Sequence, residues 1–263
     1  MVDVVTEQPE RLWELIRKGE FRGPTCGLCH GFAQANLVVL PKAMAFDFLL
    51  FCQRNPKPCP VLDVTEPGSP HPPMAAPEAD LRTDVPGYRV YRQGKLADEP
   101  AEISRYWQED LVAFLLGCSF TFEWAMLANG IPVRHIEEGV TVPMYVTTRE
   151  CVPAGIFRGP LVVTMRPIPQ SLVVRAVQVT SRFPAVHGAP IHIGDPSALG
   201  ISDLSKPDFG DPVTIQPGEV PVFWACGVTP QAVAMRAQPE LMITHAPGRM
   251  FVTKLREEQL SIF

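Results

Sequence analysis

Several patterns that would assign a function quickly are missing from this chain of 263 residues. No stretch approaches the ~18 consecutive apolar residues that a membrane-spanning helix requires. No block of lysine and arginine occurs and the formal net charge is −5, so we expect no nucleic-acid and no membrane partner. The motifs GxGxxG, GxxxxGK[ST] and GxSxG are absent, which removes the motif-based case for a dinucleotide, a nucleoside triphosphate or a serine hydrolase. These absences favour a small-molecule substrate.

The N-terminal stretch MVDVVTEQPERLWELIRKGEF has no basic start followed by an apolar run, the pattern of an export signal. The seven cysteines are an odd number. Without an export signal, an odd count fits reduced thiols better than a set of disulfides. We therefore expect a cytoplasmic protein with free thiols.

Proline and glycine are abundant, with 29 and 19 residues, which predicts short elements separated by many turns. Apolar residues make up 46% of the chain and charged residues 19%, values typical of a globular fold. The length allows one large domain or two modest ones.

The N-terminal half reads as a series of mostly helical elements. We expect a helix over 9–18, a strand over 34–40 and a helix from Pro41 to the residue before Asn55. The proline-rich residues 55–77 are expected to be an ordered connector and not an element. The apolar segment 102–130 predicts two helices broken near Gly117.

After residue 131 short β-branched runs predict strands over 161–165 and 172–180. A further strand over 220–225 should lead into a helix with Thr229 as its N-cap. We predict an α/β fold in which residues 1–130 and 205–263 form a mixed-sheet αβ core. Residues 131–204 would form a smaller β-rich α+β subdomain.

The motif Cys26–Gly–Leu–Cys29–His30 has the C-x-x-C-H spacing of covalent haem attachment. Haem attachment of this kind belongs to export compartments, and the chain has no export signal, so we expect no haem. A zinc or redox role for the thiols is a weaker alternative to two small apolar side chains in a glycine-rich turn.

Residues 134–139 place an arginine, a histidine and two carboxylates close together. In an extended segment His135 and Glu137 would share one face and could form an acid/base pair. Arg134 and Glu138 would face the other way. The alternative is a salt-bridged strand edge without a catalytic role.

Residues 181–196 form a second polar cluster, with Arg182, His187, His192 and Asp195 among turn-forming residues. Metal binding by the two histidines and the aspartate is conceivable, but no zinc-protease signature accompanies it. Histidines satisfied by the backbone are the alternative.

A third candidate is the turn between the strand over 220–225 and the next helix, which holds Cys226, Gly227 and Thr229. A helix N-terminus there would attract a carboxylate and would lower the pKa of Cys226. His245 follows a later apolar run, at another strand end.

Nine blocks of the sequence together resemble one protein family. They are QANLVVLP (34–41), FCQRNPKPCPVLDVTEPG (51–68), ADLRTDVPGYRVYRQG (79–94), DLVAFLLGCSFTFE (110–123), GIPVRHIEEG (130–139), SRFPAVHGAPIHIGDP (181–196), PDFGD (207–211), GEVPVFWACGVTPQ (218–231) and ITHAPG (243–248). They resemble the hydro-lyase family that is also called the D-glutamate cyclase family. A mammalian member is associated with conversion of D-glutamate to 5-oxo-D-proline and water. The resemblance implies an α/β fold of two unequal parts and loss of water from a small amino-acid-like acid.

Ring closure needs a base for the amine, an acid for the departing oxygen and cations or N–H groups for the carboxylates. The candidates for catalysis are His135, Glu137, Glu138, His187, His192, Asp195 and His245. The candidates for substrate binding are Arg134, Arg182, Cys226, Gly227 and Thr229. We expect no cofactor and no metal, and homo-oligomerisation is left open. Two alternatives are a metal-assisted dehydratase of a hydroxy acid, acting through residues 187–195, and a noncatalytic binder of small acids.

Overall fold

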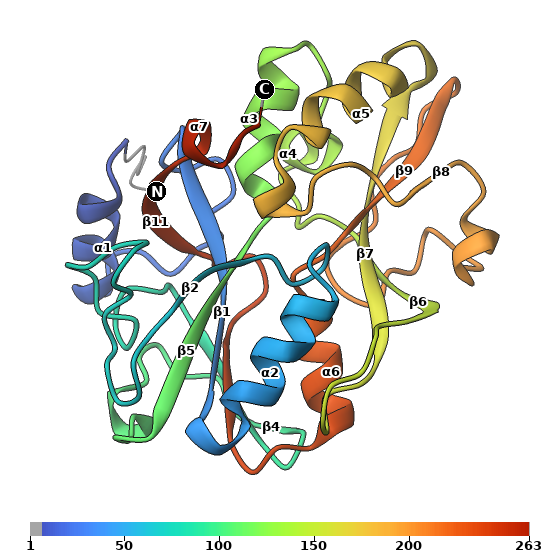
Figure 1. Cartoon of the computed structure of the whole chain (residues 1–263). Helices are drawn as coiled ribbons and strands as arrows, with labels where there is room; N and C mark the ends of the chain where they lie inside the picture. Colours follow the sequence, from blue (N-terminus) through green and yellow to red (C-terminus); the bar gives the residue numbers. More distant parts are fainter. Residues whose placement is uncertain (1–6, 263) are drawn as a thin grey trace.

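The computed structural model describes residues 7–262, without the side chains of residues 231, 234 and 235. Its strands form two antiparallel sheets, which Figure 1 shows side by side. The first sheet has the order β2-β5-β1-β10-β3-β4, and β11 also pairs with β1. Its strands are β1 (Phe32–Pro41), β2 (Val61–Val64), β3 (Tyr88–Arg92), β4 (Lys95–Asp98), β5 (Leu111–Gly117), β10 (Met242–His245) and β11 (Phe251–Arg256).

The second sheet has the order β6-β7-β9-β8. Its strands are β6 (Met144–Glu150), β7 (Pro160–Pro169), β8 (His192–Ile193) and β9 (Glu219–Ala225). Thr164 of β7 is opposite Trp224 of β9. This sheet therefore takes one strand from beyond residue 204.

The helices lie around the two sheets (Figure 1). They are α1 (Pro9–Arg17), α2 (Lys42–Arg54), α3 (Phe120–Ala128), α4 (Arg134–Glu138), α5 (Val173–Ser181), α6 (Thr229–Ala237) and α7 (Glu257–Leu260). The helices α2 and α6 share a hydrophobic cluster with β1 and β5. The helices α3 and α5 share another with β7 and β9. Helix α2 follows Pro41 as predicted and buries Phe48, Phe51 and Cys52, which lie on one helical face.

The segment 102–130 differs from its prediction in the first half, where residues 111–117 form strand β5 and not a helix. Every residue of β5 is buried, as is nearly every residue of its neighbour β1. A strand covered on both faces is apolar at every position, so it cannot be distinguished from a buried helix by periodicity. The second half is helical as predicted, and Gly130 follows α3 with a φ of 71°.

Two further local predictions are wrong. Residues 173–181 form helix α5, because Ala176 and Thr180 are buried at helical spacing while Val174 is exposed. The proline-rich connector contains strand β2, whose Asp63 carboxylate accepts the backbone N–H groups of Met74 and Ala75. The strands β7 and β9 and helix α1 confirm their predictions. Within residues 7–262, no helix has the length and apolar character needed to cross a membrane.

Candidate functional site

A small, partly open cavity of about 20 Å³ lies where the two sheets meet. The first sheet contributes β1, the β5–α3 turn and the β10–β11 turn. The second contributes the approach to β6, strand β7 and the β9–α6 turn. The lining residues are Asn36, Cys118, Ser119, Phe120, Thr141, Val142, Met144, Thr164, Cys226, Gly227, Val228, Gly248 and Met250. A space of this size holds about one water molecule.

A network of buried charged groups lies directly behind the cavity wall. Arg166 of β7 directs its Nε and Nη2 groups to Oε1 of Glu123, the former at 3.1 Å. His135 of α4 places Nε2 at 3.2 Å from the same carboxylate oxygen. All three side chains are at least 98% buried, with exposures of 0%, 2% and 2%. Charged groups this deep are stable only when they are paired and hydrogen-bonded.

The charges of this network determine the ionisation of Glu123. Burial by itself would raise the pKa of the carboxyl, but the neighbouring His135 and Arg166 outweigh it and lower the pKa to about 2. Arg166 also lies over the rings of Phe122 and Trp224, at 5.5 and 5.4 Å from their centroids. The result is a fixed carboxylate and a fixed guanidinium in a site shielded from water.

Two hydroxyl groups connect this network to the cavity. Arg166 donates from Nη2 to Ser119 Oγ and from Nη1 to Thr164 Oγ1, each at 3.0 Å. Ser119 and Thr164 both line the cavity. Because each hydroxyl oxygen accepts a hydrogen bond from Arg166, its own hydrogen remains available as a donor.

The other wall is held by Asn36 of β1. Its Nδ2 donates to the carbonyls of Leu116 and Gly117 at 3.3 and 3.1 Å, and its Oδ1 lies 3.1 Å from His245 Nε2. A Cβ atom at Gly227 would be 2.0 Å from Asn36 Nδ2, so the β9–α6 turn requires glycine for this approach. Burial lowers the pKa of His245 to about 4, which keeps the imidazole neutral.

Two thiols face the cavity, one from each sheet. Cys118 follows β5 and Cys226 follows β9. Burial raises the pKa of Cys118 to about 12 and that of Cys226 to about 11. The predicted lowering at Cys226 is wrong, because the loss of water around the thiolate outweighs the nearby helix N-terminus.

A third thiol, Cys26, lies against the charged network. Its Sγ donates to Glu123 Oε2 at 3.6 Å and lies 3.9 Å from His135 Nε2. These three ligand atoms lie within 4.8 Å of one another, a spacing that could accommodate a metal ion. The donor chemistry fits a metal poorly, because Arg166 already neutralises Glu123 and burial raises the pKa of the Cys26 thiol.

The C-x-x-C-H motif does not form one ligand set. Cys29 packs with Leu12 and Ile16 in a separate cluster. The His30 ring lies against the Trp124 ring, with centroids 3.5 Å apart and planes tilted by 38°, and its Nε2 bonds the Gly27 carbonyl. The three side chains of the motif therefore point to three different places, and the absence of haem stays a prediction.

The structure separates the residues of the 134–139 cluster. These residues form α4 and not an extended segment, so the prediction that His135 and Glu137 share a face is wrong. Glu137 is exposed and pairs with Arg134 at 3.1 Å. Arg134 also donates to Glu219 at 2.6 Å, and Glu138 accepts from the backbone N–H of Thr214. Only His135 of this group reaches the cavity region.

The candidate residues of the 187–195 loop also have separate partners and do not form one site. His187 is buried with a φ of 85°, and its Nδ1 lies 2.6 Å from the Lys57 carbonyl. Burial lowers the pKa of His187 to about 4. His192 bonds the backbone carbonyl of Asp195, whose carboxylate accepts from Ser197. In the described part of the chain these three side chains form no metal-ligating group, so a metal site there is not supported.

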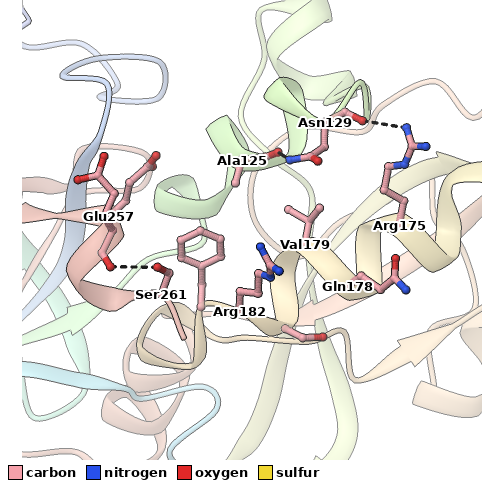
Figure 2. Close-up of a pocket in the computed structure, with 11 residues that line it drawn as sticks. Ala125, Asn129, Arg175, Gln178, Val179, Arg182, Glu257 and Ser261 are labelled. Carbon is pink, nitrogen blue, oxygen red and sulfur yellow. Dashed lines mark hydrogen bonds between the residues drawn. The ribbon is translucent and has the colours of Figure 1, made fainter. Parts of the chain in front are cut away.

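Among the predicted binding residues, Cys226 and Gly227 line the cavity and Thr229 lies next to it. Thr229 Oγ1 accepts the N–H of Val162 and donates to the Cys226 carbonyl, which fastens the β9–α6 turn to β7. Arg182 lies elsewhere, in an open surface pocket of about 830 Å³ between α3, α5 and α7. Figure 2 shows this pocket, with Arg175 and Arg182 coming from the α5 side and Glu257 from the other.

Sequence reasoning missed Asn36, Cys118, Ser119, Glu123, Thr164 and Arg166. For three of these residues the sequence itself contains a recognisable pattern. Asn36, Glu123 and Arg166 are isolated polar residues inside apolar runs, QANLVVL, FTFEWAML and LVVTMRPIP. A polar residue in a buried element needs partners, so each such residue indicates a polar site within the core.

Comparison with known proteins gives the family directly. The sequence model described as D-glutamate cyclase matches residues 112–254, more than half of the chain. This chain belongs to the D-glutamate cyclase family. The predicted resemblance is thereby confirmed, and the matched part contains Cys118, Ser119, Glu123, Arg166 and Cys226.

Curated relatives are similar to this member of the D-glutamate cyclase family over almost its whole length. A Bacillus licheniformis protein is 67% identical over 97% of both chains. A Stutzerimonas stutzeri protein is 66% identical over 97% of this chain and 96% of its own. A Bacillus subtilis protein is 65% identical over 97% and 99%. Each is named "Putative hydro-lyase". The crystal structure of a nitrogen repressor-like protein from Methanococcus jannaschii aligns at 9% identity with a TM-score of 0.40, a likeness too weak to inform fold or function.

Proposed function

We propose that this protein is a carbon–oxygen hydro-lyase that removes water from a small amino-acid-like acid, with D-glutamate as substrate and 5-oxo-D-proline as product. The observation that carries the proposal is the small cavity between the sheets, backed by the buried Glu123–Arg166 pair. The family match and the names of the relatives support the same reaction class.

Cyclisation of D-glutamate forms a bond between its nitrogen and the side-chain carboxyl carbon. One carbon–oxygen bond breaks, and the oxygen leaves as water with protons that come from the amine and the surrounding groups. Donors aimed at the carboxyl oxygen would stabilise the charge that develops there. Ser119 and Thr164 supply such donors, because Arg166 occupies their lone pairs and leaves their hydrogens for the cavity.

A charged carboxylate would be expensive to desolvate in this cavity without a compensating charge. Arg166 supplies positive potential from directly behind the two hydroxyls, and Glu123 with His135 holds the guanidinium in place. Preorganised groups of this kind need no rearrangement during the reaction. Glu123 and His135 therefore act as positioning residues in this proposal.

The cavity holds about one water in the present form, so glutamate binding requires the two sheets to separate locally. The walls are suited to this, because each sheet contributes its own set of residues. Closure around the substrate would then exclude water, which matters for a reaction that releases water.

The proposal is tested by incubating the purified protein with D- and L-acidic amino acids and following loss of one water by mass spectrometry. We expect 5-oxoproline from D-glutamate. Another dehydration product with no turnover of D-glutamate would exclude this substrate and retain the reaction class. Stabilisation by these acids without any turnover would favour the noncatalytic binder instead.

A further inference from the structure

The two cavity thiols occupy equivalent positions in the two halves of the site. Cys118 is the first residue after β5 and precedes helix α3, and Cys226 is the first residue after β9 and precedes helix α6. The Cys226 sulfur accepts the backbone N–H of Val228 at 3.4 Å. Each sheet thus presents one thiol to the same cavity.

The surroundings of both thiols are apolar. Cys118 and Cys226 belong to one buried cluster with Val142, Met144 and Met250. Both are free thiols. Ser119, Thr164 and Asn36 form the polar part of the cavity wall. On the apolar part, the groups that can give or take a proton are the two thiols.

We propose that Cys118 and Cys226 form a two-thiol acid–base pair that inverts the α-carbon of an acidic amino acid bound in the cavity. The activity is racemisation, in addition to the dehydration proposed above. It rests on the proposed function in one respect, that the cavity between the sheets is where the amino acid binds.

The proton and electron balance of this step is complete without a cofactor. One cysteine first gives up its proton to water while the site is open to admit the substrate. Its thiolate then takes the proton from Cα, and the electron pair of the broken C–H bond moves into the adjacent carboxylate. The thiol of the second cysteine then donates its proton to the opposite face of Cα. The first cysteine ends as a thiol and the second as a thiolate, so the reverse reaction uses the same pair with the roles exchanged.

Thiols in this setting suit the abstraction of a weakly acidic proton. A base buried among apolar groups is stronger than the same base in water, because the charged form loses its hydration. At Cys226 the backbone N–H of Val228 gives the thiolate one compensating hydrogen bond. Ser119 and Thr164, which present hydroxyls to the same cavity, would hold the carboxylate whose charge grows during the step.

The test follows inversion of D-glutamate in D₂O by the full-length protein. Wild type, Cys118→Ser, Cys226→Ser and Cys151→Ser are compared. Cys151 is a matched control, because it is a buried free thiol that packs in a different cluster, against α2. Chiral chromatography with mass detection measures L-glutamate and its deuterium at Cα, and 5-oxoproline is measured in the same samples.

We expect wild type and Cys151→Ser to form L-glutamate with one carbon-bound deuterium. The rate should fall at least about 100-fold in each of the two cavity variants. If a serine variant does not fold, Cys118→Ala or Cys226→Ala keeps the wall apolar and replaces it.

Absence of labelled L-glutamate with wild type, or inversion that survives the loss of either thiol, overturns the thiol pair. The two proposals can fail separately. Formation of 5-oxoproline without inversion contradicts the thiol pair and leaves the dehydration standing. Inversion without 5-oxoproline supports the thiol pair and contradicts the dehydration.

Discussion

The surface pocket at α5 is much larger than the cavity between the sheets, but the cavity has the more organised set of charged side chains. The surface pocket is about 830 Å³ and the cavity about 20 Å³. The cavity is backed by three charged or titratable side chains that bond one another at almost complete burial. In the surface pocket, Arg175 donates to the backbone carbonyl of Asn129, Arg175 and Arg182 are exposed, and Glu257 is half-buried.

Buried, fully paired charge therefore supports the cavity as the candidate site more strongly than open volume supports the surface pocket. Burying an ionised group costs several kcal/mol unless partners compensate it. The stability of the fold therefore depends on Glu123 and Arg166 keeping their paired positions. Exposed arginines at a surface pocket need no such partners.

The largest effect is expected from Arg166→Met, which leaves the Glu123 carboxylate buried beside His135 alone. The free energy of unfolding should fall by about 3–5 kcal/mol, measured by urea denaturation. Arg236→Met is the matched control, because Arg236 pairs with Glu150 at the surface, and it should change stability by at most about 1 kcal/mol. Equal losses in the two variants would contradict the distinction between the regions.

The pH dependence of stability should report the buried histidines. Burial lowers the pKa of His187 and of His245 to about 4, while an unfolded histidine titrates near ~6.5. Between these values the unfolded state binds more protons, so stability should fall as the pH drops from about 6.5 to 4. Glu123, with its pKa lowered to about 2, extends the loss below about pH 4.5.

His187→Asn sharpens this prediction, because asparagine tolerates a positive φ and can donate to the Lys57 carbonyl in place of the ring nitrogen. Thermal unfolding between pH 6.5 and 4 should be less pH-dependent in the variant. A slope identical to that of wild type would mean that His187 is not held neutral by burial.

A smaller effect is expected on turnover from the two residues of α4. His135→Ala removes the bond to Glu123 Oε1 and should lower D-glutamate turnover about 10–100-fold, since loss of support displaces the reacting groups. Glu137→Gln changes only an exposed ion pair with Arg134 and should leave turnover and melting temperature unchanged. Turnover measured beside thermal unfolding separates the two roles, and equal turnover in both variants would remove the positioning role of His135.

The smallest effect is expected in the surface pocket. Burial raises the pKa of Glu257, followed by the repulsion of Glu258, so the charged form slightly disfavours folding. Glu257→Gln should leave the free energy of unfolding unchanged or raise it by less than about 1 kcal/mol. A loss comparable to that of Arg166→Met would mean that this pocket also depends on a fixed charge arrangement.

The sequence was informative wherever one local rule decided the structure. Pro41 and the buried spacing of Phe48, Phe51 and Cys52 give helix α2, and the β-branched run after residue 160 gives β7. It was ambiguous where tertiary cover decides. Residues 111–117 are apolar at every position, and only the pairing with β1 and β2 makes them a strand.

The candidate site was predictable in part for the same reason. Cys226, Gly227 and His245 lie at strand ends, where turn chemistry shows in the sequence, and they reach the cavity region. The Glu123–Arg166 pair joins α3 to β7 across 43 positions in the chain. No local rule pairs residues so far apart, although their isolation in apolar runs marks each of them as needing a partner.

The most direct test of the central claim compares D-glutamate turnover in Thr164→Val and Arg182→Ala. Thr164→Val keeps the shape of the cavity wall and removes the hydroxyl that Arg166 orients, and Arg182→Ala removes the guanidinium from the surface pocket. With 5-oxoproline followed by mass spectrometry, we predict that Thr164→Val loses about 10²–10³-fold in turnover and that Arg182→Ala keeps the wild-type rate. Full activity in Thr164→Val together with loss of activity in Arg182→Ala would place the chemistry in the surface pocket and contradict the account.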